Sequence, residues 1–442
     1  MRTRTRSSLR RVLPLLALAA AGLAGCNDVL DVKQPGLITE EDSKSNKALL
    51  EPIVNDAEGE YHAAFNWMAN SGAAMSDEAL FGHGWSPWEQ YDNRDVTPDG
   101  GAWDGIGYGY VTRARVAGAR AVERVKSLGG TQEQLARALV YAGFSTVLEA
   151  DYMCKIVLNG GAPVTPAAAY DSAIALFTAA ATAAAGAGRA DLTNLANVGA
   201  ARAYLNQGNF AKAAEFAAKV PASFEAFVKF VDADFGQWSD KYNLYARTSG
   251  FKSATEFSLG LDPVMWATKR DLRVPFLADS TTPMFTSKPY VRRSYVPFIP
   301  YSFEGWTPGN KKLIPGDAGI RFASGLEAQY ILAEAALNGA GSWTQAQVLA
   351  FVNARRAVGA GKADPFVPGD LKAELRTQRM LDFYFAGYRV PDLIRYQTLY
   401  HLDLWPKGKI GGFPADAPYT YGSTTCLPIA ASEITANPSA GS

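Results

Sequence analysis

The feature that most constrains the fold of this chain is a helical periodicity with small residues where two helices would meet. It is clearest between residues 197 and 220. Ala203 lies on the apolar face of a first helix, Asn209 follows at a turn, and Ala214 opens the same face of a second helix. Pro221 ends that helix, because proline cannot continue the helical hydrogen bonds. The spacing therefore predicts two antiparallel helices that approach closely.

Two further stretches have the same rhythm, residues 134–158 followed by 170–184, and residues 326–337 followed by 345–356. Paired helices that bury their apolar faces only by stacking on neighbours are the packing principle of tetratricopeptide units. Strand signals are few and short. We therefore predict a mostly all-α fold, a tetratricopeptide-like scaffold of helical pairs with long irregular loops. Periodicity places its helices at about residues 47–70, 103–127, 131–157, 169–186, 191–206, 209–219, 324–338, 344–356 and 370–386.

Three irregular blocks rich in aromatic residues and proline interrupt this scaffold, at about residues 71–102, 222–320 and 387–442. Insertions on a helical array usually carry its binding surface, because a rigid scaffold positions exposed loops. We expect one domain over residues 42–442, with ligand contacts in these blocks.

The N-terminus has the order of a secretory signal, in which arginines precede an apolar run over residues 12–24. This run is too short to span a bilayer stably, and it ends in Leu-Ala-Gly-Cys at Cys26. Small residues before a cysteine suit a lipoprotein signal peptidase, so we predict a signal peptide over residues 1–25, a lipidated Cys26 and a tether over residues 26–41. Acyl chains such as palmitate would then hold the chain on the membrane. An ordinary secretory signal or an uncut anchor are the alternatives.

Charge and cysteine content narrow the possible functions. Loss of the first 25 residues would leave 38 basic against 43 acidic residues, a net charge of −5, which disfavours a nucleic-acid partner. Besides Cys26, the chain contains Cys154 and Cys426, which are far apart in sequence and could pair in an oxidising compartment or stay separate.

No pattern for catalysis, a metal or a cofactor stands out. His62, His83 and His401 are isolated, and the sequence contains no HExxH, CxxC, GxSxG or Walker pattern. Asp77 and Glu78 are adjacent, so they do not usually project to a common side as an acid pair would, and a capping or structural role is favoured. We therefore predict no catalytic residue, no metal site and no cofactor.

Two aromatic groups in the irregular blocks are the candidate ligand contacts. Sugar recognition calls for flat aromatic faces beside hydrogen-bonding groups in a partly desolvated cleft. The first group is Trp85, Trp88 and Tyr91 with Asn93, in a stretch rich in glycine and proline. Trp103 begins a helix and is expected in the core instead.

The second group centres on Tyr301 and Trp306. The alternative for both groups is that aromatic side chains pin long loops to the scaffold. Trp238, Trp266 and Trp405 are weaker candidates for ligand contact. The other members of the second group are Tyr290, Tyr295 and Phe303, interleaved with Arg292, Arg293, Glu304 and Asn310.

Several motifs recur in the order of a known family, and together they cover nearly the whole chain after Cys26. The sequence resembles the SusD/RagB-like nutrient-binding lipoproteins that partner SusC-like TonB-dependent transporters. The motifs are Leu30-Asp31-Val32 with Pro35, Ser76-Asp77-Glu78, Trp103-Asp104 with Tyr110 and Arg113, residues 136–141 (ARALVY), 327–335 (EAQYILAEA), 376–395 and 427–438 (LPIAASEITANP).

The sequence also departs from the family pattern. Gln378 and Asp382 stand where glutamates are usual, Tyr388 precedes Arg389 where a histidine or tyrosine is usual, and Val390 with the following proline replaces an aromatic pair. These departures alter a packing element. The middle of the chain is also shorter than in many relatives, in the region where ligand specificity is built.

The resemblance implies a SusD-like α/α superhelix that packs against a transporter barrel and binds nutrient without chemistry. The favoured ligand is a polysaccharide or oligosaccharide such as starch, with a peptide or a small chelate left open. The implied location is the bacterial outer membrane, lipid-anchored and exposed at the cell surface.

Two rival functions belong to other classes. An envelope adaptor would bind protein partners in an extended groove without an aromatic platform. A surface hydrolase would lose turnover when one carboxylate is replaced.

Overall fold

The computed structural model describes residues 40–81, 86–231, 243–245, 257–258, 271–279, 294–409 and 420–441. The chain divides into two compact units between Leu49 and Leu50. In the first unit, the described part contains helix α2 (Glu40–Ser45) and the 3₁₀ turn η1 (Lys47–Leu49). The first turn of α2 contains three acidic residues, whose negative charges interact favourably with the positive, N-terminal end of the helix dipole. Cys26, the predicted signal peptide and nearly all of the predicted tether lie outside the described residues.

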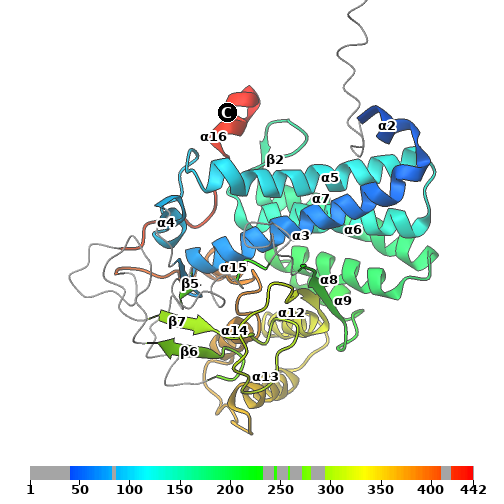
Figure 1. The fold of residues 1–442 in the computed structure, drawn as a ribbon. Helices are drawn as coiled ribbons and strands as arrows, with labels where there is room; N and C mark the ends of the chain where they lie inside the picture. Colours follow the sequence, from blue (N-terminus) through cyan, green and yellow to red (C-terminus); the bar gives the residue numbers. More distant parts are fainter. Residues whose placement is uncertain are drawn as a thin grey trace, which may run out of the picture. The chain divides into compact units, whose positions relative to one another are not determined.

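The second unit contains a stack of helices in which most pack on the next helix along the chain (Figure 1). Helix α3 packs on α5, α5 on α6, α6 on α7, α7 on α8, α8 on α9 and α9 on α12. The predicted, mostly α-helical scaffold of paired helices is confirmed. Its helices are α3 (Leu50–Met75), α5 (Tyr108–Ser127), α6 (Gln132–Tyr152), α7 (Pro166–Gly186), α8 (Ala190–Asn206), α9 (Phe210–Ala217), α12 (Gly325–Leu337), α13 (Gln345–Ala360), α14 (Leu371–Asp382) and α15 (Arg389–Tyr400).

Local sequence signals set the ends of these helices. Thr131 forms a capping box with Gln134 at the start of α6, and Thr344 forms one at the start of α13. The side chain of Thr165 caps α7, whose first residue is a proline. Gly361 follows α13 with φ of 70°, a left-handed conformation that glycine adopts without strain.

Small residues let the central helices approach closely. The ring of Phe177 on α7 lies between Gly143 on α6 and Gly199 on α8. A Cβ atom at Gly143 would lie 2.7 Å from the Cε1 atom of Phe177, and one at Gly199 would lie 2.3 Å from its Cζ atom. A Cβ atom at Gly118 on α5 would likewise lie 2.7 Å from the Cα atom of Ala142. Glycine at these positions therefore fixes the spacing of four consecutive helices.

Helix α7 is, within the described ranges, the one helix with the length and hydropathy of a membrane span. It is packed between α6 and α8, and Ala173, Phe177 and Ala180 on it are fully buried. Its apolar composition is explained by this packing in the helical stack.

Short antiparallel strand pairs connect the irregular segments. Strand β8 (Ile320–Ser324) is buried along its length and pairs with β4 (Glu225–Val228), with a bulge between Ala226 and Phe227. Ser324 then caps α12 by accepting a hydrogen bond from the Glu327 amide at 3.1 Å. The other pairs are β1 (Leu80–Phe81) with β5 (Phe257–Ser258), β2 (Ile156–Val157) with β3 (Pro163–Val164), and β6 (Phe276–Asp279) with β7 (Ser294–Pro297).

Two of the predicted irregular blocks contain helices. The block at 387–442 includes the twelve-residue helix α15, because Pro391 lies in its first turn, where a missing N–H breaks no helical hydrogen bond. The block at 71–102 includes α4 (Ser86–Asp92) and, at its start, the last turn of α3. Three further short elements are η2 (Trp103–Gly107), α16 (Ala431–Ala436) and η4 (Pro438–Gly441).

Hydrogen bonds and a disulfide hold the C-terminal segment against the helical scaffold. Helix α6 ends at Tyr152, five residues earlier than predicted, because Met153 is extended and the amide of Cys154 donates to the Leu427 carbonyl at 2.9 Å. Cys154 and Cys426, left open by the sequence, form a disulfide with a Cα–Cα distance of 5.1 Å. Trp103 is fully buried, as predicted, and its Nε1 donates to the carbonyl of Pro428 at 2.8 Å.

Candidate functional site

The loop between β7 and β8 positions the second aromatic group. The amide of Tyr301 donates to the Arg273 carbonyl at 2.9 Å, which fixes the loop to a neighbouring segment, and the amide of Ile299 donates to the Lys312 carbonyl at 3.0 Å within the loop. Phe303 is buried and anchors the loop in the core. A loop held in this way presents its exposed side chains with little freedom to lose on binding.

Trp306 lies in a turn of this loop, flanked by Gly305 and Gly309, whose φ angles are 82° and 70°. These left-handed conformations favour glycine. The indole Nε1 donates to the Leu272 carbonyl at 3.0 Å, which fixes the ring plane. Trp306 is half-buried, and it packs against the hydrophobic core.

Tyr301 supports Trp306 and is itself held by cations. The two ring centroids lie 4.8 Å apart in an edge-to-face arrangement. The guanidinium carbons of Arg321 and Arg355 lie 4.6 Å and 4.9 Å from the Tyr301 ring centroid. Each arginine is fixed in turn, Arg321 by Glu225 at 2.7 Å and Arg355 by a buried carboxylate. Tyr301 is therefore part of a fixed cluster that orients Trp306.

The carboxylate behind this cluster is Asp382, which is fully buried. It accepts hydrogen bonds from Arg355 at 2.7 Å, from Arg273 at 3.0 Å and from the Tyr330 hydroxyl at 2.5 Å. Burial alone would raise the pKa of Asp382, but the two guanidinium groups outweigh it and hold the pKa below its usual range. An ionised carboxylate with three partners suits packing better than proton transfer.

In the first aromatic group, the environment of Tyr91 differs from the sequence-based prediction. Tyr91, at the end of α4, is 1% exposed, and its hydroxyl lies under Gly107, where an added Cβ atom would be 3.1 Å away. Burial raises its pKa. Tyr91 is thus a core residue and offers no ring face to a ligand in this structure, which corrects the expectation for it.

The other members of this group are less completely described. Asn93 is half-buried in the turn after α4, and its carbonyl accepts a hydrogen bond from the amide of Gly422 at 2.6 Å. Trp88 lies in α4 without a described side chain, and Trp85 lies outside the described residues.

A chain of contacts connects the two groups. Helix α4 contacts β1, β1 pairs with β5, and β5 contacts β7, which leads into the loop that carries Tyr301 and Trp306. In Figure 1, α4 and the β6–β7 pair lie on the same side of the helical stack. Short strands therefore connect helix α4 to the loop that carries Tyr301 and Trp306.

Most of the remaining candidate residues that the structure describes have structural roles. Glu304 pairs with Lys229 at 2.6 Å, and Asn310 donates to the Ile299 carbonyl at 3.1 Å. Trp405 is buried beneath Arg94, whose guanidinium carbon lies 4.8 Å from the Trp405 ring. The side chain of Tyr295 is not described, and Tyr290, Arg292, Arg293, Trp238 and Trp266 lie outside the described residues.

Asp77 and Glu78 have structural roles, as the sequence favoured. Asp77 accepts two hydrogen bonds of 2.6 Å from Arg389. Glu78 is buried and accepts from the Phe385 amide at 3.3 Å, and burial followed by the nearby Asp77 charge raises its pKa to about 8. In the part of the chain that the structure describes, no group of three or more histidine, cysteine or acidic residues could hold a metal ion.

Sequence reasoning missed a cleft of about 390 Å³ beside the disulfide. The cleft lies among α6, α7, α8, α15 and the segment at Cys426, and its mainly apolar lining also includes the polar side chains of Gln207, Gln397 and Thr398. Its one aromatic residue, Tyr170, is buried and donates to Asp151 at 2.6 Å. The cleft thus lacks an exposed aromatic platform. Its walls come from five segments between residues 150 and 426, so no local sequence pattern indicates the cleft.

No profile of a known protein family matches this sequence, and no curated protein matches it. Solved structures do match. A surface glycan-binding protein A from Bacteroides uniformis is 15% identical, with 89% of this chain and 98% of that chain covered and a TM-score of 0.62. A SusD-like carbohydrate binding protein from Bacteroides vulgatus is 14% identical, with 88% and 97% covered and a TM-score of 0.59. B. fragilis NanU is 12% identical, with 92% and 98% covered and a TM-score of 0.62.

Proposed function

We propose that this chain, which has the SusD-like fold, captures glycan at the bacterial cell surface and passes it to a SusC-like TonB-dependent transporter, without catalysing a reaction. The observation that carries the proposal is Trp306, a half-buried residue whose indole is fixed by its Nε1 hydrogen bond in a loop that is itself fixed to the core. Solved structures with this fold include proteins described as glycan-binding and carbohydrate-binding.

The physical reason is that a sugar presents C–H groups on one face and hydroxyls at its rim. An indole with a fixed plane can stack on the C–H face without losing rotational freedom. Peptide uptake remains the alternative for the same loops, because aromatic rings also accept peptide side chains. An envelope adaptor is the second alternative, supported by the stacked helical pairs.

The test is calorimetric titration of the chain from Asn27 to Ser442 with panels of soluble oligosaccharides and peptides. Trp306→Ala should weaken oligosaccharide binding by roughly tenfold or more, since it removes the stacking face. Trp343→Ala is the matched control, because Trp343 is also half-buried and instead packs against Phe351 on α13. Equal affinity in both variants would reject Trp306 as the platform. A heat of binding with peptides alone would favour peptide uptake. No heat of binding with either panel would favour the adaptor function.

The anchor and the partner need separate tests. Cys26 is proposed as the lipidated residue, so Cys26→Ser should abolish incorporation of labelled palmitate and release the protein from membranes. Incorporation that persists in this variant would contradict the proposal. For the partner, purification of the tagged chain from outer membranes should retain a large TonB-dependent barrel, and its absence under mild detergent would count against hand-over.

A further inference from the structure

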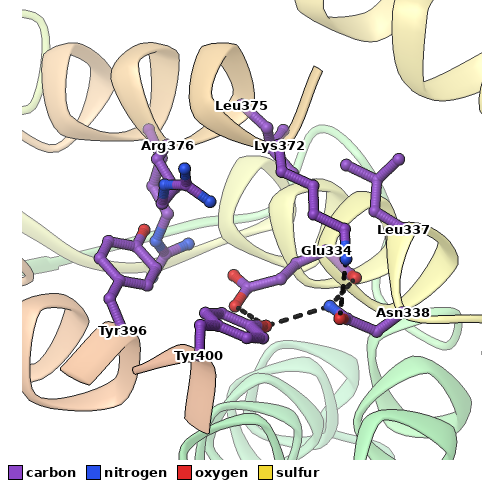
Figure 2. Close-up of a pocket in the computed structure, with 9 residues that line it drawn as sticks. Glu334, Leu337, Asn338, Lys372, Leu375, Arg376, Tyr396 and Tyr400 are labelled. Atoms are coloured by element: carbon purple, nitrogen blue, oxygen red, sulfur yellow. Dashed lines mark hydrogen bonds between the residues drawn. The ribbon is translucent and has the colours of Figure 1, made fainter. Parts of the chain in front are cut away.

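A small pocket lies where the end of α12 meets α14 and α15, within the helical part of the molecule. Figure 2 shows Lys372 and Arg376 extending from α14 toward Glu334, Tyr396 and Tyr400. Leu337 and Leu375 contribute apolar walls.

The acidic group in this pocket is already neutralised. Glu334 accepts hydrogen bonds from Nε and Nη2 of Arg395 at 3.0 and 3.1 Å, and from the Tyr400 hydroxyl at 2.8 Å. Asn338 donates to the Tyr400 hydroxyl at 3.0 Å and holds it in place. The carboxylate of Glu334 is therefore saturated by its own neighbours.

The neighbouring acids are also engaged. Asp392 pairs with Arg379 at 2.7 Å and with Arg395 at 2.8 Å, while Glu374 pairs with Arg356 at 2.6 Å. Arg379 and Arg395 thus balance Glu334 and Asp392, and Glu374 is balanced by its own arginine. The charges of Lys372 and Arg376 remain uncompensated at the pocket.

These two cations also have unused donors. In the described ranges, no hydrogen bond or ion pair engages the guanidinium of Arg376, whose nearest aromatic partner is the Tyr396 ring at 5.7 Å. Lys372 makes one long hydrogen bond, 3.4 Å to Asn338. Deeper in the wall, Nη1 of Arg379 is buried without a hydrogen-bond partner among the described residues.

The size of the pocket limits what can enter. Its volume is about 20 Å³, which is room for roughly one or two water-sized groups. A carboxylate has two oxygen atoms in one plane and matches the fork of a guanidinium group. A whole sugar ring or peptide side chain would have to remain outside.

We propose that this pocket binds the carboxylate group of a ligand, with Arg376 and Lys372 as its donors and the two tyrosine rings as its walls. The site is separate from the aromatic face around Trp306 and does not depend on the glycan proposal. The ligand would be a small organic acid or an acidic sugar whose carboxylate enters the pocket.

The experiment uses the protein from Asn27 to Ser442 and saturation-transfer NMR with matched probe pairs, acetate against acetamide and galacturonate against galactose. Only the charged member of a pair should bind, and its affinity should fall at high salt, because exposed charge interactions are screened. Binding of galacturonate but not acetate would identify an acidic sugar as the source of the carboxylate, and binding of both would identify the carboxylate alone as sufficient.

The variants separate this pocket from general positive charge. Arg376→Gln and Lys372→Gln should each weaken binding of the charged probe, with about a tenfold loss for Arg376→Gln. Lys362→Gln is the matched control, since Lys362 is an exposed cation in the turn after α13, and it should leave affinity unchanged. Equal binding of charged and neutral probes, or equal losses in all three variants, would overturn the proposal. Trp306→Ala should not change acetate binding, so failure here and failure of the glycan proposal are distinguishable.

Discussion

The central helices and the C-terminal helices are held together by different physical means. Between α6, α7 and α8 the close approach depends on small apolar residues, with Phe177 fitted between Gly143 and Gly199. Between α12, α14 and α15 they are buried ion pairs, such as Glu334 with Arg395 and Asp392 with Arg379.

This difference determines which kind of substitution destabilises each region. Apolar packing depends on volume, so it is sensitive to a single added carbon. A buried ion pair gains little net stability over apolar packing, but the loss of one member leaves a buried charge without a partner. The C-terminal helices should therefore be the region most sensitive to charge removal.

The largest effect is expected at Asp382. Asp382→Ala leaves Arg273 and Arg355 buried without their shared carboxylate, which should lower the free energy of unfolding by about 3–5 kcal/mol. Urea denaturation measures this decrease in the free energy of unfolding. Glu225→Gln is the control, because that carboxylate is 48% exposed and its pair with Arg321 should be worth no more than about 1 kcal/mol. Similar losses for both variants would refute the proposed contrast between buried and exposed pairs.

Glu78 should give the next largest effect, through pH. Its folded pKa is raised to about 8, above the ordinary value of 4.5, so its contribution to stability is full below pH 4.5 and is lost as pH rises to about 8. The loss should approach about 1.4 kcal/mol per pH unit at most. Glu78→Gln should match the parent protein near pH 5 and exceed it near pH 8 in urea denaturation. A constant difference across this range would contradict a raised pKa.

Gly199 tests the apolar region. Gly199→Ala would place a Cβ atom 2.3 Å from Phe177, so the free energy of unfolding should fall by about 1–3 kcal/mol. Adding Phe177→Leu should cost less in this background than in the parent protein, because the smaller side chain relieves the clash. Additive losses in the double variant would show that the two residues do not compete for the same space.

A helix cap should give the smallest effect. Thr344→Ala removes the side chain that accepts from the Gln347 amide at 3.3 Å and should lower the free energy of unfolding by about 1 kcal/mol. Thr344→Ser keeps the hydroxyl and serves as the control. A serine variant as unstable as the alanine variant would rule out capping as the cause.

Local sequence signals determine much of the scaffold. The pairs α6–α7, α8–α9 and α12–α13 follow from apolar spacing, capping residues and terminal glycine or proline. Helix α15 was missed because a proline in a first turn has the same appearance in sequence as a proline that ends a helix. The contrast between Trp103 in the core and Trp306 in a loop was also readable from sequence context.

The candidate site was only partly predictable. The aromatic content of the loops pointed to Tyr301 and Trp306, but no sequence pattern indicated that two arginines hold the Tyr301 ring or that Tyr91 is buried. Both facts depend on segments that are distant along the chain.

The sequence by itself determined most of the helical elements, the order of the paired helices and the positions of the aromatic loops, because these depend on neighbouring residues. The tertiary structure alone decided the Cys154–Cys426 disulfide, the balance of charges around Glu334 and which aromatic rings stay exposed. The physical reason is that burial, ion pairing and disulfide formation depend on distances between side chains, and only the packed fold fixes these distances.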